Sequence, residues 1–279
     1  MTSVQRELGS LGIPPLKRFG QHFLVDEQVR DELVDLADLT ARDTVLEVGP
    51  GLGFLTSILA RKAGHVIAVE KDRTLAGYLK KKFSDCRNVE VIQGDILTTE
   101  IPNSSKIVSS PPYNISSKLL LKILASKFRF ASLLMQDEFV RRLTASAGSR
   151  DYGRLTVMLQ SRAKANFVGH VPRSSFYPRP RVDSALVTIA PADEPLIKDG
   201  GIFEDLVRVL FTQRRRTLMG VFRRFVQQYY LSQSDSILKR IVVPEKRVYE
   251  TTPQELAALS DQIGHILTER KEEIEHLGG

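Results

Sequence analysis

Short apolar runs alternate with segments of helical spacing between residues 44 and 145, and no other feature limits the fold as strongly. The segments between the runs repeat apolar residues with the period of a helix. The runs cover residues 44–48, 65–72, 89–97, 106–110 and the start of 131–145. Strands that alternate with helices in this way predict a doubly wound, mostly parallel, Rossmann-like α/β sheet.

Two later apolar runs, 155–171 and 185–191, flank a proline-rich loop. We expect them to form an antiparallel pair at the edge of the sheet. A stretch rich in proline, glycine and acids at 191–201 then has the composition of a linker. The sheet domain is therefore expected to span residues 1–195.

Helical spacing dominates after the linker, in residues 201–230 and again in 253–277. Thr252 is the expected N-cap of the last helix, with Pro253 at its first position, where proline is well tolerated. We therefore expect a second, small and all-helical domain at residues 200–279.

A glycine-rich loop, GPGLG at 49–53, lies between the first predicted strand and its helix. In such a position glycine lets the backbone approach a ligand at the helix N-terminus. Glu70 ends the next strand, where a carboxylate can accept both hydroxyls of a ribose. Asp95 ends the third strand and is placed to accept from an adenine amino group.

The residues around this loop identify the ligand more closely. A dinucleotide fingerprint that starts at Gly49 would need Gly or Ala where this chain has Phe54. The acid that precedes the loop, Glu47, would repel a pyrophosphate but would attract a ligand that carries an ammonium and a sulfonium. The pattern therefore predicts S-adenosyl-L-methionine as the cofactor.

The stretch SSPPYN at 109–114 follows the fourth strand, at the edge of the sheet where the ligand is expected. The exocyclic amine of adenine is a poor nucleophile because its lone pair is delocalised into the ring. Two acceptors aimed at its hydrogens, the Ser110 hydroxyl and the Pro111 carbonyl, would localise that lone pair. Tyr113 then offers a ring face on which an extruded base can stack.

The charge distribution favours a polyanionic partner. The formal net charge is +7 and the pI is near 9.5. Residues 150–181 hold seven Arg and Lys against one acid, and residues 201–250 hold ten against five. Clustering of this kind is typical of nucleic-acid binding, although composition alone does not separate it from an evenly basic surface.

Several classes of protein are excluded or disfavoured. Cys86 is the sole cysteine, and no Cys/His cluster has metal-ligand spacing, so neither an internal disulfide nor a metal site is expected. No apolar run approaches the roughly 20 residues that cross a bilayer, and the N-terminus lacks the apolar core of a signal peptide. We therefore expect a cytoplasmic protein without a membrane partner.

The motifs taken together resemble a known family. Ser110-Pro111-Pro112-Tyr113 fits the pattern of amino-directed adenine methyltransferases, and further segments resemble the KsgA-type small-subunit ribosomal RNA adenine dimethyltransferases. These segments are LKRFGQHFLVD (16–26), LEVGPGLGFLT (46–56), GDIL (94–97), SFYPRPRVDSALV (175–187) and FTQRRRTL (211–218). They occur in the family's order over nearly the whole chain.

The resemblance implies roles for individual residues. The implied catalytic residues are Ser110, Pro111, Tyr113 and Phe176, the two rings sandwiching the target base. The implied cofactor-binding residues are His22, Leu24, Gly49, Gly51, Glu70, Asp95, Ile96 and Ser110. The implied RNA-binding residues are Arg179, Arg181, Arg214, Arg215, Arg216 and Arg223. Residues 1–30 are implied to cover the cofactor and contact RNA, and 200–279 to bind RNA.

The resemblance also implies a reaction. Methyl groups pass from S-adenosylmethionine to N6 of two adjacent adenosines near the 3′ end of small-subunit rRNA, giving N6,N6-dimethyladenosine. The implied substrate lies within a pre-assembled small ribosomal subunit, the enzyme is a monomer, and it takes part in small-subunit biogenesis. Ser110 and His22 replace residues that are frequently Asn in bacterial members, which indicates an archaeal source.

Three alternatives stay open. One is the related family that dimethylates one adenosine of large-subunit rRNA and confers macrolide resistance; GQHFL and QRRRTL favour the small-subunit enzymes. Another is a non-catalytic RNA-binding assembly factor, which the intact acceptor and cofactor positions disfavour. The third is a nicotinamide oxidoreductase. It is disfavoured because Phe54 stands where the dinucleotide fingerprint needs Gly or Ala, and because it would not explain SPPYN.

Overall fold

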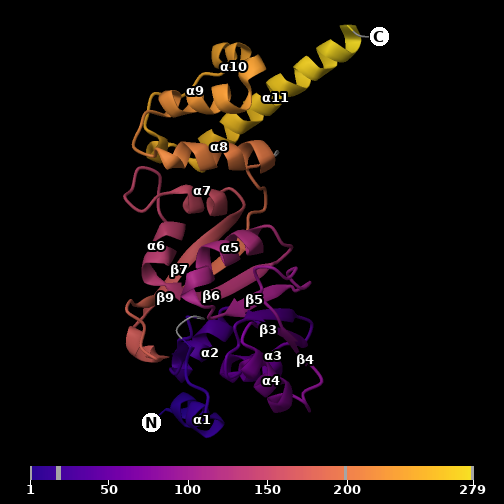
Figure 1. Cartoon of the computed structure of the whole chain (residues 1–279), viewed down its shortest axis with the longest axis vertical. Helices are drawn as coiled ribbons and strands as arrows, with labels where there is room; N and C mark the ends of the chain where they lie inside the picture. The colour runs from indigo at the N-terminus through magenta and orange to yellow at the C-terminus, as the bar shows by residue number, and fades with distance from the viewer. Residues whose placement is uncertain (1, 17–19, 198–199, 278–279) are drawn as a thin grey trace. The chain divides into compact units, whose positions relative to one another are not determined.

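A computed structural model describes residues 2–16, 20–197 and 200–277, with side chains described up to residue 269 (Figure 1). Its contacts divide the chain into two units. The first comprises residues 1–141 and 164–191, and the second comprises 142–163 and 192–279. Residues 142–163, which the sequence analysis placed in the first domain, therefore group with the C-terminal helices.

The first unit contains a seven-stranded sheet, as the sequence predicts. Its strand order is β4-β3-β2-β5-β6-β9-β7, in which β4 to β6 run parallel and β9 is antiparallel to β6. The strands are β2 (Thr44–Val48), β3 (His65–Glu70), β4 (Val89–Gln93), β5 (Lys106–Ser109), β6 (Phe130–Gln136), β7 (Ala163–Val171) and β9 (Ser184–Pro191). The order reverses between β2 and β5, and such a reversal is where doubly wound sheets bind ligands.

Helices connect the parallel strands and cover the sheet. They are α3 (Phe54–Lys62), α4 (Arg73–Lys82), α5 (Ser116–Leu124) and α6 (Asp137–Leu143), preceded by α1 (Ser3–Leu11) and α2 (Glu27–Asp35). Leu33 of α2 and Leu59 of α3 are buried against Val45, Val66 and Val108 of the central strands. α2 and α3 therefore pack together on one face of the sheet, which brings α2 beside the glycine loop.

A small two-stranded sheet joins two segments that are far apart in the sequence. β1 (Phe23–Leu24) pairs antiparallel with β8 (Phe176–Tyr177), with Leu24 opposite Phe176. The Val25 amide adds a 2.8 Å hydrogen bond to the Ser175 carbonyl. The N-terminal motif and the predicted base-pocket loop are thus held side by side, although residues 17–19 of that motif lie outside the described residues.

One predicted strand begins later than its sequence pattern indicates. The run 155–171 was expected to be extended, but α7 (Arg154–Gln160) takes its first part and only β7 is a strand. β7 does lie at the edge of the sheet beside β9, as expected. A continuous apolar run does not distinguish a buried helix from a buried strand, and Thr156 favours the helix by accepting the Gly153 amide at 3.1 Å.

The second unit is helical around an apolar core. α7 is joined by α8 (Gly200–Thr212), α9 (Leu218–Tyr229), α10 (Ser234–Arg240) and α11 (Pro253–Leu277). Phe203, Phe222 and Phe225 are fully buried in this unit. Thr252 accepts from the Glu255 amide while Glu255 accepts from the Thr252 amide, so the predicted start of α11 at Pro253 is confirmed.

The segment 201–230, predicted as one helix, is two helices with a break at 213–217. The break is held by backbone hydrogen bonds to a distant segment: the Val248 amide donates to the Arg216 carbonyl, and the Leu218 amide donates to the Lys246 carbonyl. No described helix is both long and apolar enough to cross a membrane.

Candidate active site

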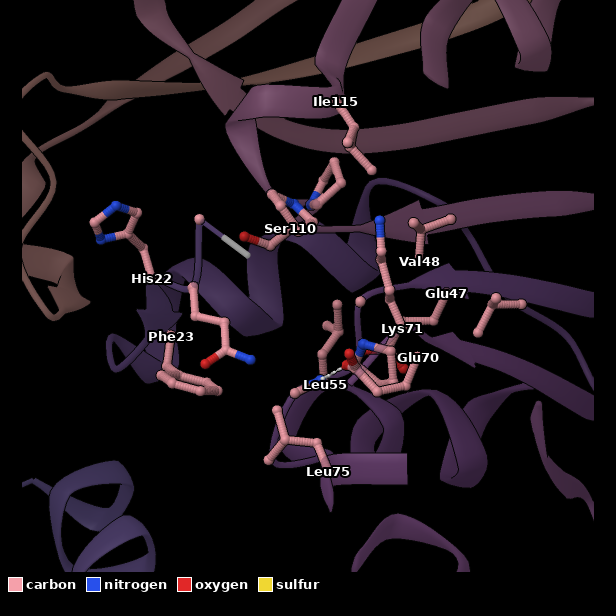
Figure 2. Close-up of a pocket in the computed structure, with 18 of the residues that line it drawn as sticks. His22, Phe23, Glu47, Val48, Leu55, Glu70, Lys71, Leu75, Ser110 and Ile115 are labelled. Atoms are coloured by element: carbon pink, nitrogen blue, oxygen red, sulfur yellow. Dashed lines mark hydrogen bonds between the residues drawn. The ribbon is translucent and has the colours of Figure 1, made fainter. Parts of the chain in front are cut away.

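A pocket opens at the carboxyl ends of β2, β3 and β5, where the strand order reverses. It is lined by Glu47 of β2 and the glycine loop that follows, by Glu70 at the end of β3 and Lys71 after it, and by Ser110 after β5 (Figure 2). All eight predicted cofactor-binding residues line it: His22, Leu24, Gly49, Gly51, Glu70, Asp95, Ile96 and Ser110. The structure therefore brings these eight residues together around one pocket.

The glycine loop is held tightly between two other segments. Gly51 has a φ of +59°, and a Cβ there would lie 2.9 Å from the Phe23 ring. Gly49 has a φ of +70°, and its Cβ would lie 3.1 Å from Cδ of Pro112. Side chains at either position would be strained and would push β1 or the SPPY turn away from the loop.

Glu70 is fixed by the backbone around it. One carboxylate oxygen accepts the Gly51 amide at 3.1 Å (Figure 2), and the other accepts the Asp72 amide at 2.8 Å. Burial raises the pKa of Glu70, and these two hydrogen bonds oppose that rise. A carboxylate has about four acceptor sites, so Glu70 retains capacity to accept from a ligand hydroxyl.

Glu47 is buried with less support for its charge. Its carboxylate accepts one hydrogen bond, from the Thr56 hydroxyl at 2.7 Å, and its exposed fraction is 2%. Burial, with a further contribution from the charge of Glu70, raises the pKa of Glu47 to about 8. A positively charged ligand group in this pocket would favour the ionised form.

Asp95 lies on the β4 side of the pocket and is paired with Lys71. The Lys71 ammonium lies 2.7 Å from its carboxylate, and the Leu97 amide donates to the other oxygen at 3.0 Å. The hydrogen bond from Lys71 is the main reason that the pKa of Asp95 is lowered. Lys71 was missed by the sequence analysis, although a cation directly after Glu70 was a visible signal.

The two serines of SSPPYN do different things. Ser109 is fully buried, donates to the Val48 carbonyl at 2.7 Å and accepts the Val48 amide at 3.2 Å, so it ties the end of β5 to β2. Ser110 and Pro111 both line the pocket, with the Ser110 hydroxyl drawn in Figure 2 on the side of His22. The predicted acceptor pair therefore lies beside the glycine loop.

Three rings gather beside Ser110. Tyr113 and Phe176 meet edge to face, with ring centroids 6.3 Å apart and an interplanar angle of 73°. The Tyr113 ring instead faces His22, at 5.8 Å and 23°. The structure thus brings the two predicted stacking residues together but does not hold them as parallel plates.

The phenol and the imidazole of this cluster are both anchored. The Tyr113 hydroxyl lies 2.6 Å from the Ser184 hydroxyl, and burial raises the pKa of Tyr113 to about 12, so the phenol stays protonated. His22 Nδ1 lies 2.7 Å from the Pro178 carbonyl and therefore donates to it. Nε2 of a neutral His22 is then an acceptor.

The predicted RNA-binding arginines do not all have the same environment. Arg179 and Arg181 are exposed on a loop of the first unit, and Arg215, Arg216 and Arg223 are exposed in the second. Arg214 differs, because its Nη2 donates to the carbonyl oxygens of Ser149 and Arg150 and its guanidinium lies over the Tyr249 ring. Arg214 therefore has a structural role within its unit.

Two further observations complete the site. Arg30 of α2 lines the pocket and was also missed, because no local pattern marks a buried arginine on an amphipathic helix.

Among the described residues, no group of His, Cys, Asp and Glu could hold a metal ion.

Comparisons with known proteins place this arrangement among rRNA-modifying enzymes. A family model described as ribosomal RNA adenine dimethylase matches residues 16–260. A protein of Pyrococcus abyssi named probable ribosomal RNA small subunit methyltransferase A is 38% identical over 259 residues, which cover 92% of this chain and 94% of the relative. The protein of the same name from Methanosarcina mazei is 38% identical over 250 residues, covering 88% and 92%.

Two solved structures share the fold. The dimethyladenosine transferase of Plasmodium falciparum has a TM-score of 0.78 and 28% identity, and the match covers 88% of this chain and 98% of that one. The 23S rRNA methyltransferase ErmE has a TM-score of 0.66 and 32% identity, with coverage of 86% and 98%.

Proposed function

This chain belongs to the ribosomal RNA adenine dimethylase family, and from that premise we propose that it makes N6,N6-dimethyladenosine at two adjacent adenosines near the 3′ end of small-subunit rRNA. The observation that carries the proposal is the position of Ser110 and Pro111, which line one pocket together with the glycine loop and Tyr113. The methyl donor is S-adenosyl-L-methionine.

The pocket residues fit this cofactor. Glu70 would accept from the ribose hydroxyls, and Asp95 with the Ile96 backbone would hold the adenine. Gly49 and Gly51 would let the methionine portion approach the backbone, since a Cβ at either position would disturb the walls of the pocket. Glu47, buried with one hydrogen bond, has the environment of a group that gains from a ligand cation. When bound, the cofactor supplies a methyl group activated by a sulfonium.

The chain's own residues would prepare the target amine. The Ser110 hydroxyl and the Pro111 carbonyl accept hydrogen bonds from N6 and localise its lone pair, and positive charge that develops on N6 strengthens both bonds. Once N6 has gained the methyl group it carries a positive charge, and it then releases one proton to water on the side of these two acceptors. Tyr113 provides the ring face for the flipped base, and buried Phe176 closes the apolar wall beside it.

The substrate would be held through its phosphates. Arg179 and Arg181 on the first unit, and Arg215, Arg216 and Arg223 on the second, are exposed cations suited to RNA. We propose that a monomer acts on rRNA within an assembled small subunit, and that the modification belongs to small-subunit biogenesis.

The second candidate is dimethylation of large-subunit rRNA. It is favoured by the 32% identity to the 23S rRNA methyltransferase ErmE. Against it, the relatives named small subunit methyltransferase A reach 35–39% identity over most of the chain. Both candidates use the same pocket, so only the substrate separates them.

The test is to incubate the protein and labelled S-adenosylmethionine with unmodified small subunits, naked small-subunit rRNA and unmodified large subunits in parallel. Methylated bases are then mapped by primer extension and by mass spectrometry of nucleosides. We expect dimethyladenosine at two neighbouring positions of the assembled small subunit. Label in large-subunit rRNA would support the second candidate, and no label in any RNA would contradict both.

A further inference from the structure

Arg30 is a buried cation whose charge is only partly compensated. It is 4% exposed, lies on the first turn of α2 and lines the pocket. Its Nη2 lies 3.2 Å from the carboxylate of Glu27, which is itself largely exposed. Nε and Nη1 are buried and have no hydrogen-bond partner among the described residues. Buried donors left without an acceptor are strongly unfavourable, so this guanidinium is prepared for an anion.

A second feature beside Arg30 also favours an anion. The guanidinium carbon lies 5.0 Å from the ring centroid of Phe54, the first residue of α3. The N-cap of α3 is Gly53, which has no side chain to cap the helix, and its first turn contains no acid. The free amides at this N-terminus carry the positive end of the helix dipole. Phe54 and Leu55 line the same pocket as Arg30.

The burial of Arg30 limits what the anion can be. A phosphate within an RNA strand cannot reach a guanidinium that lines a pocket and is only 4% exposed. A small ligand that enters the pocket can. With the nucleoside end assigned to Glu70 and Asp95, the other end of the cofactor points past the glycine loop, towards α3 and the N-terminal segment. That end carries a carboxylate.

We propose that Arg30, together with the N-terminus of α3, binds the carboxylate of the cofactor's methionine portion. The proposal rests on the proposed cofactor. Glu47 and Arg30 both line the pocket, so one buried acid would face the ammonium of the methionine portion and one buried cation its carboxylate. The assignment makes Arg30 a residue that distinguishes the full cofactor from fragments that lack the carboxylate.

The test measures binding of two ligands to the full chain by calorimetry. One is S-adenosylhomocysteine, and the other is its decarboxylated analogue, which keeps the nucleoside, the sulfur and the amine. The wild-type protein should prefer S-adenosylhomocysteine by roughly ten- to a hundredfold, as expected for charge-assisted hydrogen bonds. Arg30→Met should lose that preference, while its affinity for the decarboxylated analogue stays within about twofold.

A second cation beside the same ring provides a matched control. Lys82 lies 4.8 Å from the Phe54 centroid but is bonded to Glu7 and to the Leu52 carbonyl and does not line the pocket. Lys82→Met should therefore leave the preference unchanged. Arg30→Lys, which keeps the charge, should retain part of it and serves if Arg30→Met does not fold.

The outcomes separate the proposal from its premise. If the wild-type protein binds neither nucleoside ligand, the proposed cofactor is wrong. If it binds both equally, or if Arg30→Met weakens both by the same factor, the cofactor assignment stands and Arg30 only packs against Phe54. A preference lost in Arg30→Met and retained in Lys82→Met supports the carboxylate site.

Discussion

Glu47 and Glu70 share one pocket, but their carboxylates receive different support from the protein. Glu70 accepts two backbone amides, whereas Glu47 accepts a single hydroxyl. Without a ligand, a Glu47 with a pKa of about 8 carries a proton at neutral pH. A cation bound beside it would lower that pKa, so protonation of Glu47 and cofactor binding are coupled.

This coupling predicts proton release on cofactor binding. At pH 7 the free protein holds the Glu47 proton, and the cationic cofactor favours the ionised form, so a proton should be released. Calorimetric enthalpies measured in phosphate and in Tris should then differ in proportion to the ionisation enthalpies of the buffers. The difference should fade above about pH 9, where free Glu47 is already ionised. Glu47→Gln should abolish it, and equal enthalpies in the two buffers for the wild-type protein would exclude the coupling.

The two adjacent serines give a second prediction at this scale. Ser110→Ala should lower kcat roughly ten- to a thousandfold, because one acceptor that strengthens towards the transition state is lost. RNA affinity should barely change, and Ser110→Asn should retain substantial activity through its amide oxygen. The second methylation should suffer more than the first, since a monomethylated amine has one hydrogen left to be held. Single-turnover rates and the ratio of monomethyl to dimethyl product measure these effects.

Ser109→Ala is the matched control. Its hydroxyl bonds to the backbone of Val48 inside the protein, so its loss should lower the free energy of unfolding by about 1–3 kcal/mol. Ser110→Ala should leave the unfolding midpoint nearly unchanged. Wild-type turnover in Ser110→Ala would show that the prolines alone shape this turn.

At the scale of elements, the prediction from sequence succeeded where the pattern is local. The strands and helices from β2 to β6, and the cap of α11 at Thr252, are set by neighbouring residues and were predicted. The break at 213–217 was not, because its amides and carbonyls pair with residues 246–249, about thirty positions away. The two-residue strands β1 and β8 are likewise defined by their pairing, and no periodicity can mark so short a strand.

The break in the helix changes how its arginines should behave. Arg215 and Arg216 are exposed, whereas Arg214 bonds to backbone carbonyls within the unit. Replacing Arg215 and Arg216 with Ala should reduce the slope of log affinity for RNA against log salt by about 1.4–1.8, if each neutralises one phosphate. Dissociation constants measured at several salt concentrations give that slope, and cofactor affinity should not change.

Arg214→Ala supplies the contrast within the same loop. It should lower the unfolding midpoint, because the carbonyls of Ser149 and Arg150 lose their donor, and it should change the salt slope less than the double variant does. A slope that is unaffected by the Arg215 and Arg216 substitutions would mean that these side chains are only solvated.

For the whole molecule, most of the residues that line the pocket could be predicted from the sequence, but its buried cation, Arg30, could not. Gly49, Glu70, Asp95 and Ser110 could be predicted because parallel strands end at one edge of a sheet. Arg30 and the face-to-face contact of His22 with Tyr113 depend on how α2 and β8 pack, which needs three-dimensional structure. The unit boundary is of the same kind, because residues 142–163 join the C-terminal helices through contacts and not through sequence proximity.

That boundary leads to a prediction about the chain cut where the composition changes. A protein that ends at Pro195 keeps residues 142–163 but loses the helices that cover them. Tyr152, fully buried in the intact chain, would lose its 2.8 Å hydrogen bond to the Thr251 carbonyl and its ring contact with Phe211. The apolar side chains of α7 would be exposed as well, at a cost of about 2 kcal/mol for each large one.

The shortened chain should therefore bind a hydrophobic dye, aggregate, and melt at a lower temperature than the intact protein. Its cofactor pocket is lined by residues between Gly20 and Ile115, all in the first unit, so the soluble fraction should bind S-adenosylhomocysteine within about threefold of the intact protein. Tyr152→Phe in the intact chain removes only the hydroxyl and should cost about 1–2 kcal/mol without dye binding. A shortened chain that unfolds at the intact protein's temperature and binds no dye would mean that residues 142–163 are stable without the C-terminal helices. The contacts between residues 142–163 and the C-terminal helices would then not stabilise the protein, and a first domain of residues 1–195 would describe it better.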